Sequence, residues 1–493
     1  MITNNEVKIS VEKPSGRSER HRPQFHFSPY RNWMNDPNGL ITFNGKHHMY
    51  YQYNPHGNQW GHMSWGHATS VDLVHWSEHE VAIPEKEHMI FSGTTALDCD
   101  GKTLVAAYTS FEHGLNEKGE LNALAQHQSI AKSFDGGFSF EAIAENPVID
   151  IQSTEFRDPK LFFDQRTKKW NMLVCLSIAH TIHFYQSADL VTWEKVSEFG
   201  PLGNIDAVWE CPDLFELKIG DGEMTKWVLT VSAGHPQQGY LGMQYFIGEY
   251  DGYAFQADAL KYPLYLDYGK DFYAGITFAN TGKKECAIMM GWVGCHLYSS
   301  KTPTEQWRGL MSLPRELYLS QMGSQTVLKS RPPQHYIEAL LDRKWTREGL
   351  KIFNGAVTVP LGTKSFVASL VIGVGGAKKA GIQFLKSGNT ATEVGLDLVN
   401  NEVFFDRSKS AGSTFHEKFP GKDTISIHPD WKSVQLDIFV DHSVVEVFIQ
   451  DGHFTMTNLV FPEVDGTGIK LYADGGGALF EKVEIRTVKS IWK

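Results

Sequence analysis

The stretch Ser70-Val71-Asp72-Leu73-Val74-His75-Trp76 recurs in the chain with variations. The other copies are Ser187-Ala188-Asp189-Leu190-Val191-Thr192-Trp193, Ser133-Phe134-Asp135-Gly136-Gly137-Phe138-Ser139-Phe140 and a weaker one, Tyr250-Asp251-Gly252-Tyr253-Ala254-Phe255. Each places an aspartate in a turn and an aromatic residue after it. Successive copies lie roughly 55–65 residues apart, which is a spacing typical of repeat architectures. Chance recurrence is the alternative, but the pattern also keeps its position within each unit.

The segments around these turns have the length and composition of β-strands. Apolar runs occupy 104–108, 170–175, 227–231 and 287–292, and Asn44-Gly45 is a hairpin signal between two further strands. A repeat of this length built from short strands is typical of propeller blades, each a four-stranded sheet. The four copies, together with the strands around 287–320, predict a five-bladed β-propeller over residues 25–330.

The remainder of the chain has a different character. Alternating segments such as 366–372 and 435–440 are separated by turns such as Asp451-Gly452 and Asp465-Gly466, a pattern that predicts a β-sandwich over residues 349–493. Residues 331–348 are predicted to be a linker with a helical turn. Residues 1–24 are predicted to be an N-terminal tail that lies on the surface. The predicted fold is therefore all-β, a propeller followed by a sandwich.

Composition excludes several classes of partner. The 493 residues carry a net charge of -11, which argues against nucleic acid or an anionic membrane as partner. The five cysteines are widely spaced and include no CxxC pair, so a disulfide framework or zinc site is not expected. We expect no metal and no cofactor. No apolar run has the length of a membrane span, and the N-terminus lacks the hydrophobic segment of a signal peptide, so we expect a cytoplasmic protein, or a secreted one if a leader has been removed.

Three acidic motifs fall in three different predicted blades. They are Asn35-Asp36-Pro37, Arg157-Asp158-Pro159-Lys160 and Trp209-Glu210-Cys211-Pro212-Asp213. A propeller brings the inner strand of each blade to a central axis, so these carboxylates are expected to converge there. Singly, each acid is more easily explained as a structural turn residue. Together they suit glycoside chemistry, in which one carboxylate attacks the anomeric carbon and another protonates the leaving oxygen.

The sequence neighbours of each acid suggest its role. Trp209 and Cys211 would remove water from Glu210 and favour its protonated form, which makes Glu210 the candidate acid. Asp36 precedes the turn amides of Asn38 and Gly39 and is expected to stay ionised as the nucleophile. Asp158, beside Arg157, is expected to stay charged and to bind sugar hydroxyl groups.

At this point the chain resembles a known family, the glycoside hydrolase family 32 enzymes (invertases, exo-inulinases, levanases and related β-fructofuranosidases). The resemblance rests on motifs in the family's order from about residue 25 to residue 490: Trp33–Gly39, Tyr51–Pro55, Trp65–Ser70, Phe91–Gly93, Arg157–Pro159, Trp209–Asp213, Asp271–Ala274, Leu313–Glu316, Val440–Ser443 and Glu446–Phe448.

The resemblance implies a fold, an activity and a set of site residues. The fold is a five-bladed propeller with a β-sandwich, and the activity is hydrolysis of terminal non-reducing β-D-fructofuranosides with retention, through a covalent fructosyl-enzyme. By motif position Asp36 matches the nucleophile, Glu210 the acid/base and Asp158 the transition-state stabiliser. The residues that match the surroundings of the bound fructose are Asn35, Gln52, Trp60, Phe91, Ser92, Arg157, Tyr273 and Trp292.

Two alternatives stay open at this level. One is fructosyl transfer through the same intermediate, with a sugar hydroxyl in place of water. The other is a non-catalytic fructan-binding relative, which the intact set of three carboxylates disfavours. The expected partner is a small-molecule or oligosaccharide fructoside, and the expected oligomeric state is a monomer or homodimer.

Overall fold

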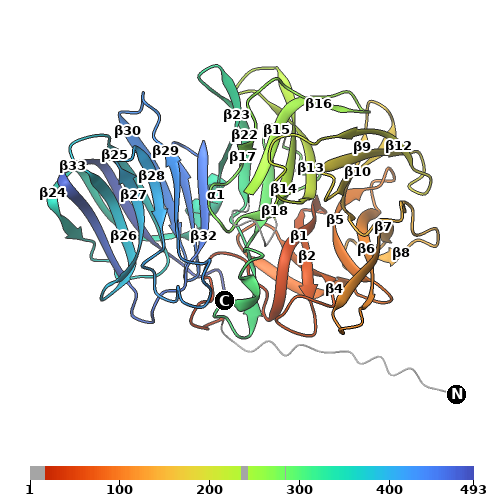
Figure 1. Cartoon of the computed structure of the whole chain (residues 1–493), viewed down its shortest axis with the longest axis horizontal. Coiled ribbons are helices and arrows are strands. Elements are labelled where there is room, and N and C mark those ends of the chain that lie inside the picture. Colours follow the sequence, from red (N-terminus) through yellow and green to blue (C-terminus); the bar gives the residue numbers. More distant parts are fainter. Residues whose placement is uncertain (1–16, 235–241, 284, 493) are drawn as a thin grey trace.

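Five small antiparallel sheets and one larger sheet make up the computed structural model, which describes residues 17–234, 242–283 and 285–492. Figure 1 shows the five sheets arranged as a β-propeller and the larger sheet domain beside it. Both predicted parts of the fold, the five-bladed propeller and the C-terminal sandwich, are confirmed. Within the described ranges, no helix is both long enough and apolar enough to cross a membrane.

Each blade is a sheet whose strands follow one another in the chain. The blades are β1–β4 (Asn32–Phe43, Lys46–Asn54, Ser64–Ser70, Trp76–Ile83), β5–β8 (Met89–Leu97, Leu104–Leu115, Leu121–Ser133, Glu141–Ala142), β9–β12 (Phe156–Asp164, Lys169–Leu176, Thr181–Ser187, Glu194–Phe199), β13–β16 (Trp209–Lys218, Thr225–Ala233, Gly242–Tyr250, Phe255–Ala257) and β18, β19, β22, β23 (Tyr273–Thr277, Ala287–Val293, Arg315–Met322, Gln325–Arg331). Short strands β17 (Leu264–Tyr265) and β21 (Leu310–Met311) extend the last two blades. Strand β20 (Trp307–Arg308) pairs in parallel with β1 and links the end of the propeller to its start.

The repeated Asp-turn-aromatic motif connects the third strand of a blade to its outer strand. In the β3–β4 turn, Asp72 accepts hydrogen bonds from the backbone N–H groups of Val74 and His75, and the indole of Trp76 donates to Leu73 O at 3.0 Å. Residues 187–193 repeat these bonds atom for atom in the β11–β12 turn. The repeat therefore encodes a side-chain-capped turn, in which the aspartate satisfies backbone donors that the strands leave free.

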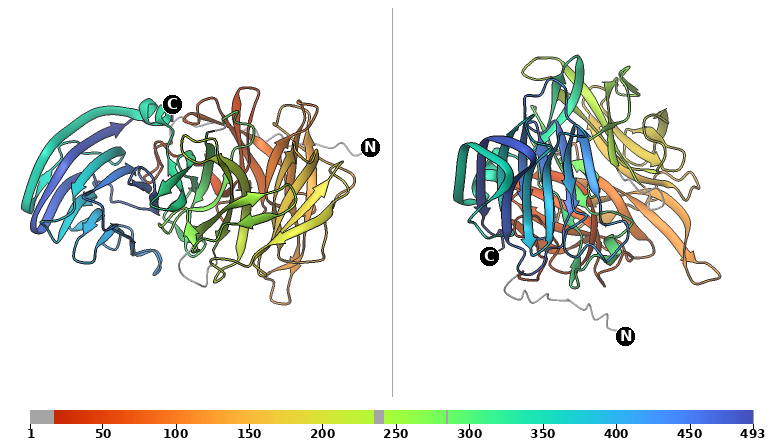
Figure 2. Two further views of the ribbon diagram at one scale, coloured as in Figure 1. Left: turned by 90° about the horizontal axis from the view of Figure 1, so that it is seen from above. Right: turned by 60° about the vertical axis from the view of Figure 1, so that its left-hand side comes forward.

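The sandwich is one continuous sheet that folds over at its longest strands. Its order is β29-β28-β27-β26-β33-β25-β30-β31-β32, and β24 pairs along the whole of β33. The strands are β24 (Leu341–Thr358), β25 (Phe366–Gly373), β26 (Lys379–Ser387), β27 (Thr390–Asp397), β28 (Glu402–Asp406), β29 (Lys422–Ser426), β30 (Ser433–Val440), β31 (Val444–Ile449), β32 (Phe454–Leu459) and β33 (Gly468–Val488). Gly475–Gly477 lie between the part of β33 that pairs with β26 and the part that pairs with β25, and they allow the strand to bend. Figure 2 shows the curved strands of this domain from two further sides. A large hydrophobic core of buried residues lies within the domain.

The connection between the domains differs from the predicted linker at 331–348. A short helix, α1 (Gln334–Leu340), follows β23, and β24 already begins at Leu341. Most side chains of β24 are exposed, and Asp342, Arg343 and Lys344 near its start are charged. A strand that packs little apolar surface against the core carries a weak alternation signal, which is why the sequence pattern missed its first half.

The N-terminal segment also differs from the predicted surface tail at 1–24. Residues 1–16 lie outside the described residues, but 17–24 are held in the body of the protein. Arg22 is fully buried and donates to the carbonyl oxygens of Pro29 and Tyr30. The backbone N–H of Gln24 donates to Asp441 of the sandwich at 2.8 Å. The charged residues of this segment suggest a solvent-exposed tail. The hydrogen bonds described above satisfy the polar groups of the buried residues, so the segment can pack inside the protein.

A buried network of charges joins the two domains. Arg315 at the start of β22 contacts Glu446 of β31 at 2.6 Å and Asp267 at 3.0 Å, with all three side chains almost fully buried. Glu446 also contacts His26 at 3.2 Å, and Asp441 contacts the other nitrogen of that ring at 3.0 Å. The Leu313–Glu316 and Val440–Phe448 motifs therefore meet in space, and their charged residues fix the sandwich against the propeller.

Replacing Arg315 by leucine should lower the free energy of unfolding by roughly 3–5 kcal/mol, because Glu446 and Asp267 would stay buried without their cation. Thermal and denaturant unfolding of the variant measure this loss. The control is Lys218→Ala, which removes an exposed partner 3.5 Å from Glu223 and should change stability by less than about 1 kcal/mol. Equal losses in the two variants would contradict the account of the interface.

Candidate active site

The inner strands of the five blades surround the propeller axis. β1 contacts β5, β5 contacts β9, β9 contacts β13, β13 contacts β18, and β18 returns to β1. Each of these strands has a shift in register near one end. The shifts fall at residues 35–36, 91–92, 158–159, 211–212 and 274–275. Irregularities of this kind re-aim side chains next to active sites, and here they bring Asp36, Asp158 and Glu210 to the axis.

Proline helps to set three of these irregularities. Pro37, Pro159 and Pro212 have no N–H to give to a neighbouring strand, so the regular ladder is interrupted at each. Asp158 and Cys211 have φ values of 65° and 49°, in the left-handed region that non-glycine residues seldom adopt. A non-glycine residue in this region has a strained backbone, which persists only where the surrounding structure enforces it. Such residues are typical of functional sites.

Asp36 is held by hydrogen bonds to both carboxylate oxygens. The hydroxyl of Ser92 donates to Oδ2 at 2.6 Å, and the amide of Asn35 donates to Oδ1 at 3.1 Å. The indole of Trp33 donates to the Asn35 side chain at 2.7 Å and so fixes the amide that holds Asp36. A carboxylate oriented in this way is suited to attack an electrophilic carbon.

Asp158 is nearly buried and sits against the backbone of the neighbouring blade. Its Oδ2 accepts from the N–H of Cys211 at 2.9 Å, and its own N–H donates to the hydroxyl of Thr109 at 2.9 Å. The thiol of Cys211 lies 3.6 Å from Asp158 and 3.7 Å from Asp36. Cys211 thus lies between two of the three carboxylates and follows the third in sequence.

Glu210 is bound by one cation and one hydroxyl group. Nε of Arg157 donates to its Oε1 at 3.0 Å, and the hydroxyl of Tyr273 donates to its Oε2. Arg157 is itself held by Gln126 at 3.2 Å and Glu155 at 2.8 Å. The arrangement leaves Glu210 oriented from two sides.

The pKa values of the three acids differ in direction. Burial raises the pKa of Asp158 to about 7, and the charge on Glu210 acts in the same direction. Burial also raises the pKa of Asp36, against the Ser92 hydrogen bond and with the repulsion of Glu210. For Glu210 burial is outweighed by the charges of Arg157 and His296 and by the Tyr273 hydroxyl, so its pKa is lowered.

These directions correct the expectation drawn from sequence neighbours. Of the three acids only Glu210 has a lowered pKa, and for Asp158 burial and the charge on Glu210 outweigh the opposing effect of Arg157. The reason is geometric: Arg157 turns its guanidinium toward Glu210, while Trp209 packs in the apolar core between blades rather than against Glu210. Cys211 faces Asp36 and Asp158.

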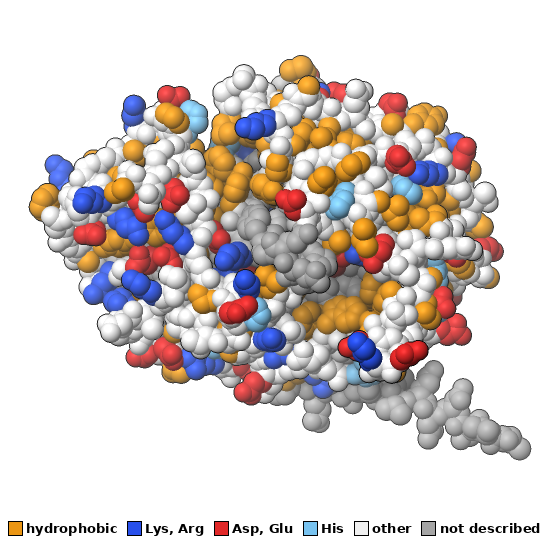
Figure 3. Space-filling model, in the orientation of Figure 1, with side chains coloured by type: hydrophobic (Ala, Val, Ile, Leu, Met, Phe, Trp, Pro, Cys, Tyr) orange, Lys and Arg blue, Asp and Glu red, His pale blue; other side chains and the backbone are white. Residues whose placement is uncertain are grey.

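The structure also places the other residues predicted to surround a bound sugar. Phe91 stacks on Phe111 with ring centroids 4.3 Å apart, and the half-exposed Trp60 meets Phe91 edge-on at 6.0 Å. Trp292 is buried, with its ring 6.3 Å from Trp33. Gln52 is buried and donates to Ile90 O at 2.9 Å, immediately before the Phe91-Ser92 irregularity. Figure 3 shows hydrophobic side chains gathered over the propeller half of the molecule.

Sequence reasoning missed several contacts of the site. Thr109, Gln126 and Glu155 support Asp158 and Arg157, and His296 lies close to Glu210. None belongs to an acidic motif, and Gln126 and Glu155 act on Glu210 only through Arg157. Cys211 differs from these residues because it lies within an acidic motif, between Glu210 and Pro212. The motif does not indicate its contacts with Asp36 and Asp158, which come from other blades.

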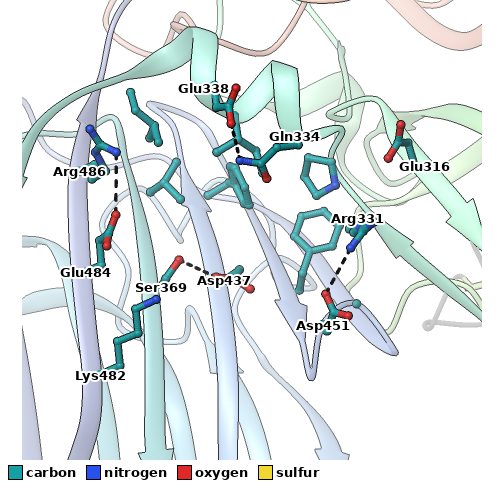
Figure 4. Close-up of a pocket in the computed structure, with 17 residues that line it drawn as sticks. Glu316, Arg331, Gln334, Glu338, Ser369, Asp437, Asp451, Lys482, Glu484 and Arg486 are labelled. Atoms are coloured by element: carbon teal, nitrogen blue, oxygen red, sulfur yellow. Dashed lines mark hydrogen bonds and ion pairs between the residues drawn. The ribbon is translucent and has the colours of Figure 1, made fainter. Parts of the chain in front are cut away.

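Another groove lies away from the three carboxylates. It has a volume of about 700 Å³ and lies between α1 and the outer face of the sandwich, with residues of β23, β25, β30 and β33 in its wall. Its polar groups mostly bind each other, as Ser369 does with Asp437 at 2.6 Å and Gln334 with Glu338 at 2.9 Å (Figure 4). Over the described ranges, no cluster of His, Cys, Asp or Glu could hold a metal ion.

Asp158→Asn should stabilise the protein increasingly as the pH rises. Because the folded pKa of about 7 exceeds the ordinary value of 3.8, the folded wild type binds more protons than the unfolded chain between these values, and its stability falls across this window. Asparagine has no such titration. The gain over wild type should grow from about pH 4 to about pH 7, by at most about 1.4 kcal/mol per pH unit. Unfolding curves at several pH values measure it, and a pH-independent difference would contradict the raised pKa.

Comparison with known proteins agrees with this geometry. The model of the glycosyl hydrolases family 32 N-terminal domain matches residues 26–332, and the model of the family 32 C-terminal domain matches residues 338–487. A levanase of Bacillus subtilis is 38% identical over 497 residues, which cover 96% of this chain and 71% of the relative. An extracellular exo-inulinase of Aspergillus niger is 35% identical over 512 residues, covering 96% and 95%.

Solved structures show the same likeness in three dimensions. The crystal structure of exo-inulinase from Aspergillus awamori superposes with a TM-score of 0.90 at 34% identity, covering 97% of this chain and 100% of that one. The fructofuranosidase from Schwanniomyces occidentalis, complexed with fructose, superposes with a TM-score of 0.86 at 30% identity, covering 96% and 99%. With both family domains matched along nearly the whole chain, the protein belongs to glycoside hydrolase family 32 and is an enzyme that hydrolyses fructosides.

Proposed function

We propose that this enzyme is a retaining, exo-acting β-fructofuranosidase. It removes terminal non-reducing β-D-fructofuranosyl units from sucrose and fructo-oligosaccharides, and from inulin-type or levan-type chains, through a covalent fructosyl-enzyme. The observation that carries the proposal is the meeting of Asp36, Asp158 and Glu210 around Cys211, each held by its own hydrogen bonds. The levanase and exo-inulinase names of the relatives support a fructan as substrate.

In the proposed reaction the carboxylate of Asp36 attacks C2 of the terminal fructosyl unit. Glu210 gives its proton to the departing oxygen, so the glycosidic bond breaks as the Asp36–fructosyl bond forms. Glu210 then takes a proton from water, which attacks C2 and releases fructose and Asp36. Two successive inversions at C2 give net retention. Asp158 accepts hydrogen bonds from sugar hydroxyl groups, which strengthen as positive charge develops on the ring.

Glu210 must be protonated to act as the acid, although its pKa is lowered while those of Asp36 and Asp158 are raised. The three carboxylates interact strongly, so they titrate as a unit rather than independently. Hydrogen bonds that sugar hydroxyl groups donate to Asp36 and Asp158 favour the ionised forms of these two acids. We propose that substrate binding thereby moves a proton from Asp36 or Asp158 to Glu210. The first step requires this arrangement, with Glu210 protonated and Asp36 ionised.

A substrate panel tests the proposed function. Sucrose, 1-kestose, inulin, levan and sucrose-6-phosphate are each incubated with the enzyme, and free fructose and glucose are measured. We expect equal fructose and glucose from sucrose, and fructose without oligosaccharides from the polymers. A strong excess of glucose at high sucrose would indicate fructosyl transfer. Oligosaccharides released early from inulin or levan would contradict exo-action.

A further inference from the structure

His296 lies three residues beyond the end of β19, beside the side chains that hold Glu210. Its ring meets the ring of Tyr273 edge-on, with centroids 4.7 Å apart, and that of Trp292 at 5.2 Å. The hydroxyl of Tyr273 in turn donates to Glu210. His296 therefore borders the site directly, although neither the acidic motifs nor the family pattern pointed to it.

The ring of His296 has one polar atom that the protein leaves unused. Nε2 is buried and, among the described residues, has no hydrogen-bond partner; the same holds for Nε1 of Trp292. Packing holds the segment that carries them: a Cβ on Gly294 would lie 2.2 Å from the Trp292 indole. A buried polar atom without a partner costs free energy. At the edge of a sugar site, a ligand hydroxyl is the group that would satisfy it.

His296 is also close enough to two of the carboxylates to influence them electrostatically. Burial is the largest influence on Asp36 and Glu210 and acts to raise their pKa values, and His296 acts in the opposite direction on both; the net result is a raised pKa for Asp36 and a lowered pKa for Glu210. Among the described residues, Tyr273 of β18 contacts this ring, and Glu210 of β13 and Asp36 of β1 interact with it electrostatically. An imidazole in this place is therefore close to two of the three acids.

We propose that His296 is a substrate-binding residue whose Nε2 forms a hydrogen bond with a hydroxyl group of the bound fructoside. The inference rests on the proposed function, since it takes a fructoside as the ligand. Every sugar hydroxyl group can donate and accept, so either tautomer of the imidazole serves. The Tyr273 and Trp292 rings fix the orientation of His296, and the substrate completes its hydrogen bonding.

Three substitutions at His296 distinguish the contribution of Nε2 to substrate binding from that of the aromatic ring. His296→Phe keeps the aromatic contacts and loses Nε2, and it should raise KM for sucrose by about ten-fold with kcat changed less than about three-fold. His296→Gln restores a polar nitrogen and should keep KM within about three-fold of wild type. His296→Ala should regain a lower KM when free imidazole is added. This last variant gives a result even if the phenylalanine variant fails to fold.

The matched control is His21→Phe. His21 also has a buried ring nitrogen that finds no partner among the described residues. Its ring also meets an aromatic ring edge-on, Phe461 at 5.3 Å, but it lies in the N-terminal segment beside the sandwich. Its substitution should leave KM unchanged. Equal KM increases in His296→Phe and His296→Gln, or a wild-type KM in His296→Phe, would overturn the inference. Absence of fructose release by the wild type would instead overturn the proposed function.

Discussion

Asp36→Ala is expected to lower kcat on sucrose by on the order of 10⁴-fold or more, because alanine cannot form the proposed bond to C2. The fold should survive the substitution. Asp36 is half-buried beside Asp158 and Glu210, and removal of water raises its pKa, so it is not a stabilising charge. We expect the variant to unfold at the wild-type temperature or slightly above it. Steady-state kinetics and thermal unfolding measure the two effects.

Asp72→Ala is the matched control for Asp36→Ala. Asp72 caps the β3–β4 turn of the same blade, where it accepts two backbone hydrogen bonds and has a pKa lowered to about 2 against the opposing effect of burial. Its loss should cost about 1 kcal/mol of stability and leave kcat unchanged. The two aspartates thus give opposite patterns. Wild-type turnover in Asp36→Ala would exclude the nucleophile role.

Glu210→Gln is expected to slow sucrose hydrolysis by roughly 10²–10⁴-fold, the range that general acid–base catalysis contributes. Glutamine keeps the hydrogen bond to Tyr273 but cannot release a proton to the leaving oxygen. The first step should be slowed much less for a fructosyl donor with an activated leaving group, because such a group departs without protonation. The measurement compares burst rates on sucrose and on the activated donor.

Small anions provide the complementary test of Glu210. Glu210→Ala leaves room beside C2, and azide should restore part of the turnover with an activated donor by attacking the fructosyl-enzyme in place of water. The product would be the fructosyl azide of retained configuration. An unchanged rate on sucrose in Glu210→Gln, or no effect of azide on Glu210→Ala, would rule out the acid/base role.

The architecture was largely predictable because local chemistry repeats. The Asp72 turn and its copies cap equivalent blade turns, so the period visible in the sequence is the period of the fold. The prolines after Asp36 and Asp158 mark the places where the inner strands leave regular pairing. These signals act over a few residues, and a sequence displays them directly.

The protonation pattern and the supporting contacts were not predictable in the same way. Arg157 lies 53 positions before Glu210, and only the curvature of neighbouring blades brings their side chains together. His296 and Thr109 reach the carboxylates from other blades. The first half of β24 escaped notice because its exposed charged residues do not alternate with apolar ones. Each of these features depends on tertiary contact.

The most direct test of the account is to trap the fructosyl-enzyme. Glu210→Gln is incubated with β-D-fructofuranosyl fluoride, quenched, digested and analysed by mass spectrometry. Loss of the base slows the release of the sugar, so the intermediate should accumulate. The account predicts one added anhydrofructosyl unit, located on the peptide that contains Asp36 and bonded to its carboxylate. Fluoride release without any adduct, or an adduct on another residue, would contradict it.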